Sequence, residues 1–188
     1  MQPLLRLSHS IQRVSRGLGH LAALCGLALI LVGAYNALAR YAGKSLGLAL
    51  TSNGLVELQW YLFSMMFLLG APWALRQGAH VRVDIVYERY GERGRAWTNL
   101  IGTLLLLLPF AALGIYACWD FAADSIASRE MSNDPGGLAR WPIKALLPAA
   151  FGVLGLQGLA EVIGLSAFLL GKGPNPSPPT QADDGGGV

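Results

Sequence analysis

Glu161 is the residue most capable of chemistry, because it lies inside a long apolar segment near the C-terminus. Gln157 precedes it by one helical turn, so the two side chains share one face of a helix. A carboxylate near the middle of a membrane costs at least about 2 kcal/mol and marks a functional candidate. Two interpretations stay open. Glu161 pairs with Arg76, His20 or a partner subunit, or it is protonated and takes part in ion movement.

The other reactive residues do not form a catalytic or ligand-binding set. His9 and His20 are the only histidines besides His80, and no cysteine lies near His80 in the sequence. Cys25 and Cys118 fall at different depths of the segments predicted below, so we expect them to stay unpaired. We therefore predict that the protein is not an enzyme and has no catalytic residue, no cofactor and no metal site.

The composition indicates a membrane protein. Hydrophobic residues make up 53% of the 188 residues and charged residues 13%, about half the charged share of a soluble domain. The apolar residues gather in four blocks, each long enough to cross about 30 Å of hydrocarbon at 1.5 Å per residue. Backbone amides in lipid must bond within their own segment, so each block is expected to be a helix. The predicted class is all-α, an integral membrane four-helix protein, with helices at about 18–39, 58–75, 97–119 and 145–170.

Two terminal segments flank this membrane domain of residues 18–170. In residues 1–17, apolar residues recur at spacings of three and four with the arginines off that stripe, which is typical of an amphipathic helix at a membrane surface. A basic tail that only sets the topology explains the same segment equally well. Residues 171–188 are rich in proline and glycine and are predicted to be a disordered tail.

The distribution of lysine and arginine predicts the orientation. One side of the membrane would carry nine of the 14 basic residues and the other side five, and cytoplasmic loops carry the excess. Both termini are therefore expected in the cytoplasm of a bacterium, with the chain in the inner membrane. The basic residues form no continuous face, so nucleic acid is not an expected partner. The nine are Arg6, Arg13, Arg16, Arg76, Arg82, Arg89, Arg93, Arg95 and Lys172.

Polar and aromatic residues mark the ends of the predicted helices. Glu57 would sit at a membrane boundary, where it either meets Arg40 or is solvated. Trp60, Trp141 and Lys144 suit the interface between lipid and water. We expect these residues to anchor the helices in the bilayer.

The loop between the second and third predicted helices carries His80, Arg82 and Asp84. Apolar residues alternate with Arg82 and Asp84, which predicts an extended turn, and Asp84 could cap a short helix after it. His80 is either part of this turn or an ordinary surface histidine.

The fourth predicted helix carries Gly152, Gly155 and Gly158 at steps of three, with Glu161 next on the same ridge. Glycines in such a row leave a groove where another helix can approach closely. This row therefore predicts a packing surface within the chain or towards a partner.

Three stretches resemble the small membrane subunit, the DctQ-like subunit, of tripartite ATP-independent periplasmic (TRAP) transporters. The likeness covers residues from about 15 to 170, and the stretch around His80 is its most specific part. The three stretches are Glu57-x-x-Trp60 with Leu69-Gly70-Ala71 and Leu75-Arg76; His80-Val81-Arg82-Val83-Asp84; and Trp141-Pro142-Ile143-Lys144 with Pro148, Gln157 and Glu161.

The resemblance implies a scaffold role. Such a subunit pairs with a large membrane subunit and, through it, with a periplasmic binding protein, for sodium-driven uptake of an organic acid; membrane lipids surround it. One alternative is a stand-alone or self-assembling carrier or channel that uses Glu161. A membrane redox subunit fits less well, because it would need paired axial histidines.

Overall fold

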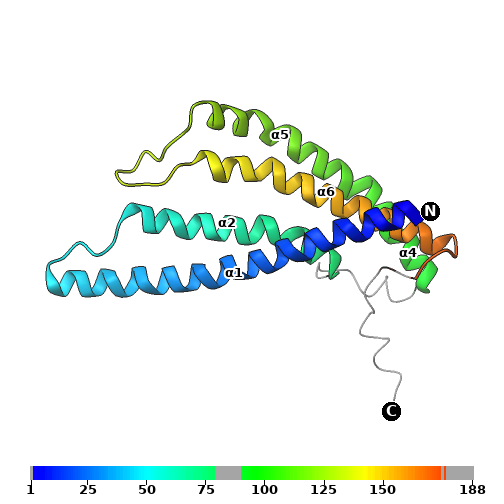
Figure 1. Cartoon of the computed structure of the whole chain (residues 1–188), viewed down its shortest axis with the longest axis horizontal. Helices are drawn as coiled ribbons and strands as arrows, with labels where there is room; N and C mark the ends of the chain where they lie inside the picture. The colour runs from blue at the N-terminus through cyan, green and yellow to red at the C-terminus, as the bar shows by residue number, and fades with distance from the viewer. Residues whose placement is uncertain (1, 79–89, 175, 177–188) are drawn as a thin grey trace, which may run out of the picture. The chain divides into compact units, whose positions relative to one another are not determined.

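The computed structural model describes residues 2–78, 90–174 and 176 of the chain. These residues form helices, and their β structure is limited to one isolated bridge between Met131 and Ala139. The predicted all-α class is therefore confirmed. In chain order the elements are α1 (Gln2–Leu46), α2 (Asn53–Arg76), α4 (Glu92–Gly102), the π-helix η1 (Thr103–Leu107), α5 (Leu108–Ala127) and α6 (Trp141–Leu169) (Figure 1).

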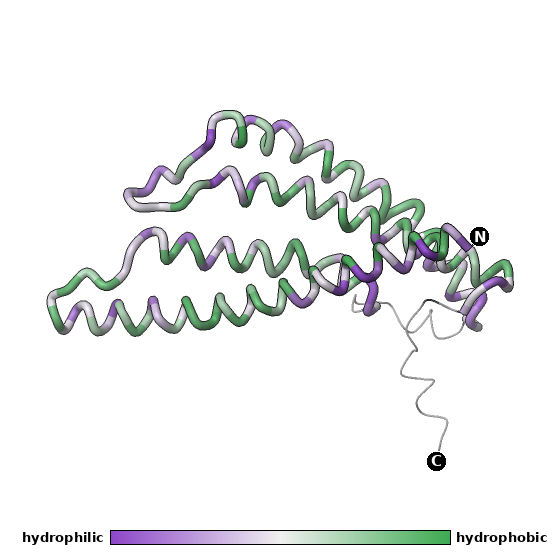
Figure 2. Tube along the Cα trace, viewed as in Figure 1, coloured by the Kyte–Doolittle hydropathy of each residue, from purple (hydrophilic) through white to green (hydrophobic). Residues whose placement is uncertain are grey.

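Four helical segments are long and apolar enough to cross a membrane, if α4, η1 and α5 count as one. In the most apolar window of each segment, no more than 22% of the residues are buried within the chain. Figure 2 shows hydrophobic residues along most of each helix. Such an apolar surface is suited to lipid or to a partner's helices rather than to water. The structure thus confirms the prediction of a four-helix membrane protein.

Glycines in the left-handed conformation follow three of the helices. Gly47 (φ 68°) follows α1, Gly78 (φ 63°) follows α2, and Gly171 (φ 69°) follows α6. Glycine adopts this conformation without a steric penalty, so it is the usual residue just beyond a helix end. Helix α1 has no break between the predicted surface segment and the first predicted span.

The π-helix η1 ends two residues before Pro109. The N–H of Leu108 reaches back five residues to the carbonyl of Thr103. Proline has no N–H to donate, so the helical bonding is interrupted at Pro109, and a wider turn there accommodates the change. This turn places Thr103 in a buried position.

The chain forms two compact units, and each helix that spans the membrane contributes to both. Unit one comprises residues 1–16, 72–113 and 152–188; unit two comprises residues 17–71 and 114–151. Unit one contains the N-terminal end of α1 and the C-terminal end of α2, and unit two contains the α5–α6 connection.

Close helix contacts within each unit depend on small residues. In unit two, a Cβ on Gly26 would lie 3.0 Å from the sulfur of Met66, and one on Gly114 would lie 2.6 Å from the ring of Phe151. The first contact joins α1 to α2, and the second joins α5 to α6. In unit one, Leu165 of α6 packs in a buried cluster with residues of α4.

Candidate functional site

Glu57 is enclosed in unit two, although it lies in the first turns of an apolar helix. Its residue surface is only 2% exposed. The hydroxyl of Ser132 donates to one carboxylate oxygen, and the N–H of Leu138 donates to the other at 2.6 Å. The partners of Glu57 thus come from the α5–α6 connection rather than from Arg40 or water.

The connection that supplies these partners is a tight hairpin. The N–H of Ser132 donates to the carbonyl of Leu138 at 3.0 Å. At its tip the N–H of Gly137 donates to the carbonyl of Asp134 at 3.0 Å, and Gly136 has a φ of 73°. Asp-Pro-Gly-Gly therefore forms a type II turn, with proline and glycine at the two positions that favour them. This signal was present in the sequence.

Two further residues of α2 hold the same hairpin. Asn53 donates from its amide to the carbonyl of Pro135 at 3.0 Å, and the hydroxyl of Tyr61 donates to the carbonyl of Ala139 at 2.8 Å. A Cβ on Gly137 would lie 2.8 Å from the carboxylate of Glu57. We name this arrangement of Asn53, Glu57 and Tyr61 on the hairpin of residues 131–139 the loop clasp.

The residues that were predicted to anchor the helices, Lys144, Trp141 and Trp60, differ from one another in their surroundings. The ammonium of Lys144 pairs with the carboxylate of Glu130 at 2.5 Å and lies 4.1 Å from the centre of the Phe121 ring. The hydrogen bond from Lys144 lowers the pKa of the Glu130 carboxyl below its ordinary value. Trp141 is the first residue of α6, and Trp60 on α2 is 54% exposed.

Unit one contains a second polar arrangement, between α1 and α6. The hydroxyl of Ser15 donates to the side-chain oxygen of Gln157 at 2.7 Å, and both residues are fully buried. The hydroxyl of Ser8 donates to the backbone carbonyl of Ala160 at 3.0 Å. The sequence analysis did not single out the two serines. Their spacing of seven residues, two helical turns, was the available signal.

Three residues of the apolar stripe in the N-terminal segment stay exposed, on the face of α1 next to these serines. Leu4, Leu7 and Val14 are exposed, while Ser8 and Ser15 are buried against α6. Within unit one, α1 therefore joins α6 through small polar residues. Its larger apolar residues remain available to lipid.

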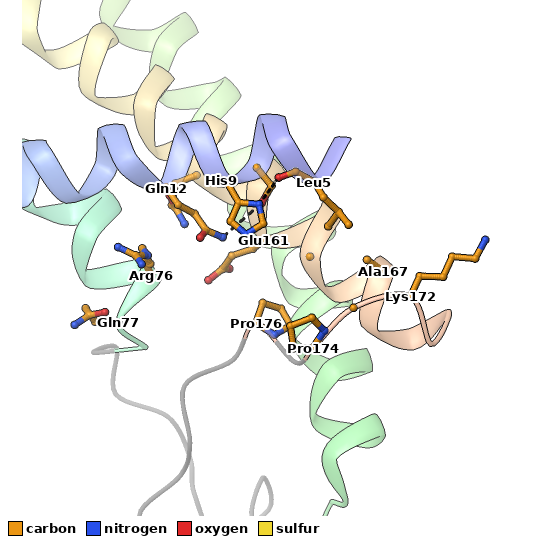
Figure 3. Close-up of a pocket in the computed structure, with 14 residues that line it drawn as sticks. Leu5, His9, Gln12, Arg76, Gln77, Glu161, Ala167, Lys172, Pro174 and Pro176 are labelled. Carbon is orange, nitrogen blue, oxygen red and sulfur yellow. Dashed lines mark hydrogen bonds between the residues drawn. The ribbon is translucent and has the colours of Figure 1, made fainter. Parts of the chain in front are cut away.

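A pocket of about 370 Å³ lies beside this arrangement, between α1, the end of α2, α6 and the residues after α6. Figure 3 shows Gln12 and His9 on α1, Arg76 at the end of α2, and Glu161 on α6 with its carboxylate directed towards the side where Arg76 lies. Gln157 also lines the pocket. The structure thus brings together Arg76, Gln157 and Glu161, three of the predicted site residues.

Two of the three glycines in the row on α6 pack against other helical segments of this chain. A Cβ on Gly158 would lie 2.9 Å from the side chain of Leu107 in η1, and one on Gly155 would lie 3.5 Å from that of Ala111 in α5. Nothing lies within 4 Å of the same position on Gly152. The groove at Gly155 and Gly158 is therefore filled inside unit one, whereas Gly152 is open.

The predicted site residues His80, Arg82 and Asp84 lie outside the described residues. His20, the other suggested partner of Glu161, belongs to unit two. Across residues 2–78, 90–174 and 176, no three His, Cys, Asp or Glu side chains are grouped closely enough to hold a metal ion.

Comparison with known proteins gives one match. No curated protein and no solved structure matches the chain. The model of the family described as "Tripartite ATP-independent periplasmic transporters, DctQ component" matches residues 29–167. These residues include the loop clasp, the glycine row and Glu161. Taken with the four apolar helices, this match shows that the chain is an integral membrane protein and belongs to the DctQ family of TRAP transporter components.

Proposed function

We propose that this chain is the small scaffold subunit of a TRAP-type permease. It pairs with a large membrane subunit, which carries substrate and ions, and through that subunit serves a periplasmic binding protein. The observation that carries the proposal is the family match over residues 29–167. The chain would support transport rather than perform it.

The polar groups of the described helices favour a supporting role. The carboxylate of Glu57 is occupied by the hairpin of residues 131–139, and the oxygen of Gln157 is occupied by Ser15. Most of the remaining helix surface is apolar. A path for ions would need a succession of polar groups through the membrane, whereas a partner subunit and lipid need an apolar surface.

The remaining parts of the proposal follow from the family and from the charge distribution. The permease lies in the bacterial inner membrane, and a sodium gradient drives uptake of an organic acid. The excess of basic residues on one side supports a cytoplasmic location for both termini. In this orientation the loop clasp faces the periplasm. A reporter that is active only in the periplasm should stay inactive when fused after Val188, and activity there would reverse the orientation.

Removal of the chain tests the scaffold role. In cells that produce the large subunit and the binding protein, deleting this chain should abolish sodium-dependent uptake of the acid that the binding protein binds. An immunoblot of the membrane fraction should show that the large subunit is still present. The full chain, when tagged, should copurify with the large subunit. Normal uptake without this chain would contradict the proposal.

Gly152 offers a sharper test of the partner-facing surface. Nothing lies within 4 Å of a Cβ placed on Gly152 or on Gly102, so a side chain at either position can leave the helix without a close contact at its first carbon. We propose that Gly152, which continues the glycine row, faces the large subunit. Gly152→Leu should then reduce copurification by roughly tenfold, the effect of losing about 1.4 kcal/mol. The matched variant Gly102→Leu should not, and equal yields from the two variants would exclude this face.

A further inference from the structure

Two hydrogen-bond donors that line the pocket of unit one have no acceptor among the described residues. Gln157 is fully buried, and its side-chain nitrogen has no hydrogen-bond partner. One terminal nitrogen of Arg76 is likewise buried without a partner. A buried donor without an acceptor costs about 1–3 kcal/mol, and a charged donor costs more. Both donors therefore favour an acceptor in this pocket.

The bond to Ser15 determines which part of Gln157 is available. The hydroxyl of Ser15 donates to the amide oxygen, so the amide nitrogen is the group that remains. A guanidinium and an amide nitrogen are both donors, and oxygen atoms of an anion accept from both. Arg76 contributes the positive charge. Its guanidinium lies 5.4 Å from the centre of the Trp73 ring.

Other polar side chains line the same pocket. His9 is engaged through its ring nitrogen with the carbonyl of Leu5 at 2.6 Å, and Glu161 has an interaction of its own. Lys172 lines the pocket, but Figure 3 shows its ammonium directed away. The anion must therefore reach Arg76 and Gln157 without displacing these contacts.

The position of the pocket, at the ends of two spans, favours a membrane lipid as the source of the anion. Arg76 is the last residue of α2, and the residues after α6 form another wall, so the pocket lies where two spans end. Basic residues at the ends of membrane helices bind phospholipid headgroups. The exposed apolar stripe of α1, which includes Leu4 and Leu7, is suited to the acyl region beside such a headgroup.

We propose that the pocket between α1, α2 and α6 binds the phosphate group of a membrane phospholipid, with Arg76 and Gln157 as its donors. A cavity of about 370 Å³ has room for a glycerophosphate headgroup as well as for the phosphate. The lipid would fill the space between the N-terminal segment of α1 and the end of α2 within unit one. This inference does not depend on a transport partner.

Lipid binding by the full chain tests the proposal directly. The purified chain, delipidated in detergent, is titrated with phosphatidylglycerol, and native mass spectrometry counts the lipids retained on each chain. The wild-type chain should retain one molecule of phosphatidylglycerol more tightly than any further molecules of this lipid. Arg76→Gln should weaken this binding roughly tenfold to a hundredfold, as expected for a lost bond to a charged group. Gln157→Glu keeps an oxygen for Ser15 but replaces the donor with a second oxygen, so it should weaken binding at least as much.

Two matched variants separate a specific site from general attraction to anionic lipid. Arg13→Gln and Arg6→Gln each remove the same charge from α1 at a residue that does not line the pocket. Both should change the lipid affinity less than twofold. Circular dichroism checks that each variant keeps its helices, and Arg76→Lys, which keeps the charge but loses the planar fork, should give intermediate binding.

Competition with inorganic phosphate identifies the source of the anion. Phosphatidylglycerol should bind while excess inorganic phosphate fails to displace it, because the acyl chains contribute to binding. Displacement by inorganic phosphate at similar concentration would overturn the lipid assignment and leave a site for free phosphate. Binding that is unchanged in Arg76→Gln, or weakened equally in Arg13→Gln, would overturn the site itself.

Discussion

Glu57 and Glu161 are carboxylates of two apolar helices, and their surroundings differ in one decisive respect. Glu57 in unit two is closed in by a hairpin that uses both of its oxygens. Glu161 in unit one lines a pocket of about 370 Å³, beside two donors that have no acceptor among the described residues. The carboxylate of Glu57 completes a contact within the fold, whereas that of Glu161 borders a pocket where a ligand can bind.

This difference teaches that the depth of an acid in a membrane helix does not by itself assign it a function. A carboxylate whose acceptor capacity is fully used by its own chain holds the fold together. A polar pocket with unused donors is suited to a ligand.

Replacement of each acid by its amide should affect the two regions unequally. Glu57→Gln replaces the charged acceptor with a neutral amide, whose oxygen can accept from the N–H of Leu138 while its nitrogen donates to the hydroxyl of Ser132. Hydrogen bonds to charged groups contribute about 1.5–3 kcal/mol and neutral ones about 1 kcal/mol, so we expect a loss of roughly 2 kcal/mol in the free energy of unfolding. Glu161 is only partly buried, and Glu161→Gln keeps the size of the side chain and one of its oxygens, so it should cost less than about 1 kcal/mol.

Thermal unfolding of the purified chain in one detergent measures both variants under the same conditions. Asp120→Asn, at an exposed position of α5, is the matched control for loss of a carboxylate and should leave the midpoint unchanged. The comparison would fail if Glu161→Gln lowered the midpoint more than Glu57→Gln.

The second prediction concerns the glycine that makes room for Glu57. A Cβ on Gly137 would lie 2.5 Å from the Cβ of Ser132 and 2.8 Å from the Glu57 carboxylate. Gly137→Ala must therefore open the loop clasp, at a cost of about 2 kcal/mol. Gly152→Ala meets nothing within 4 Å and lies in a helix, so it should be neutral or stabilising. Equal stabilities of the two variants would show that the hairpin yields without cost.

The sequence was sufficient for the four helices, because apolar runs of this length have few structural alternatives. It was less informative about their ends. Asn53 and Trp141 begin helices that were predicted to begin at 58 and 145, since a helix continues through polar residues beyond its apolar part. Gly47 and Gly171, in contrast, lie where a glycine signal for a helix end was visible.

The sites were harder to predict than the helices, and the reason is contact range. The partners of Glu57 lie 75 and 81 residues away in the chain, and Ser15 is 142 residues from Gln157. Local periodicity has no information about such pairs. It did identify Glu57 at the start of a predicted helix, and Gln157 and Glu161 as polar residues within an apolar helix. Which of them would be enclosed required the fold.

The third prediction removes a single neutral bond from the loop clasp. Tyr61→Phe loses the hydroxyl that donates to the carbonyl of Ala139, and a bond of this kind contributes about 1 kcal/mol. Tyr116→Phe is the matched control, because Tyr116 is 80% exposed. Thermal unfolding should separate the two variants. If they behave alike, the hydroxyl of Tyr61 does not contribute to the stability of the loop clasp.

The smallest effect should come from Glu130 at the foot of the same hairpin, and it should depend on pH. Lys144 lowers the pKa of the Glu130 carboxyl in the folded chain, so the unfolded chain takes up the proton first as the pH falls. The stabilisation is therefore complete above the ordinary pKa of a glutamate and is lost as the pH falls through the lowered value. Glu130→Gln should be less stable than the wild type at neutral pH and equal to it in acid. Chemical unfolding across that range measures the difference; a gap that stays constant with pH would mean that the charge of Glu130 does not hold the hairpin.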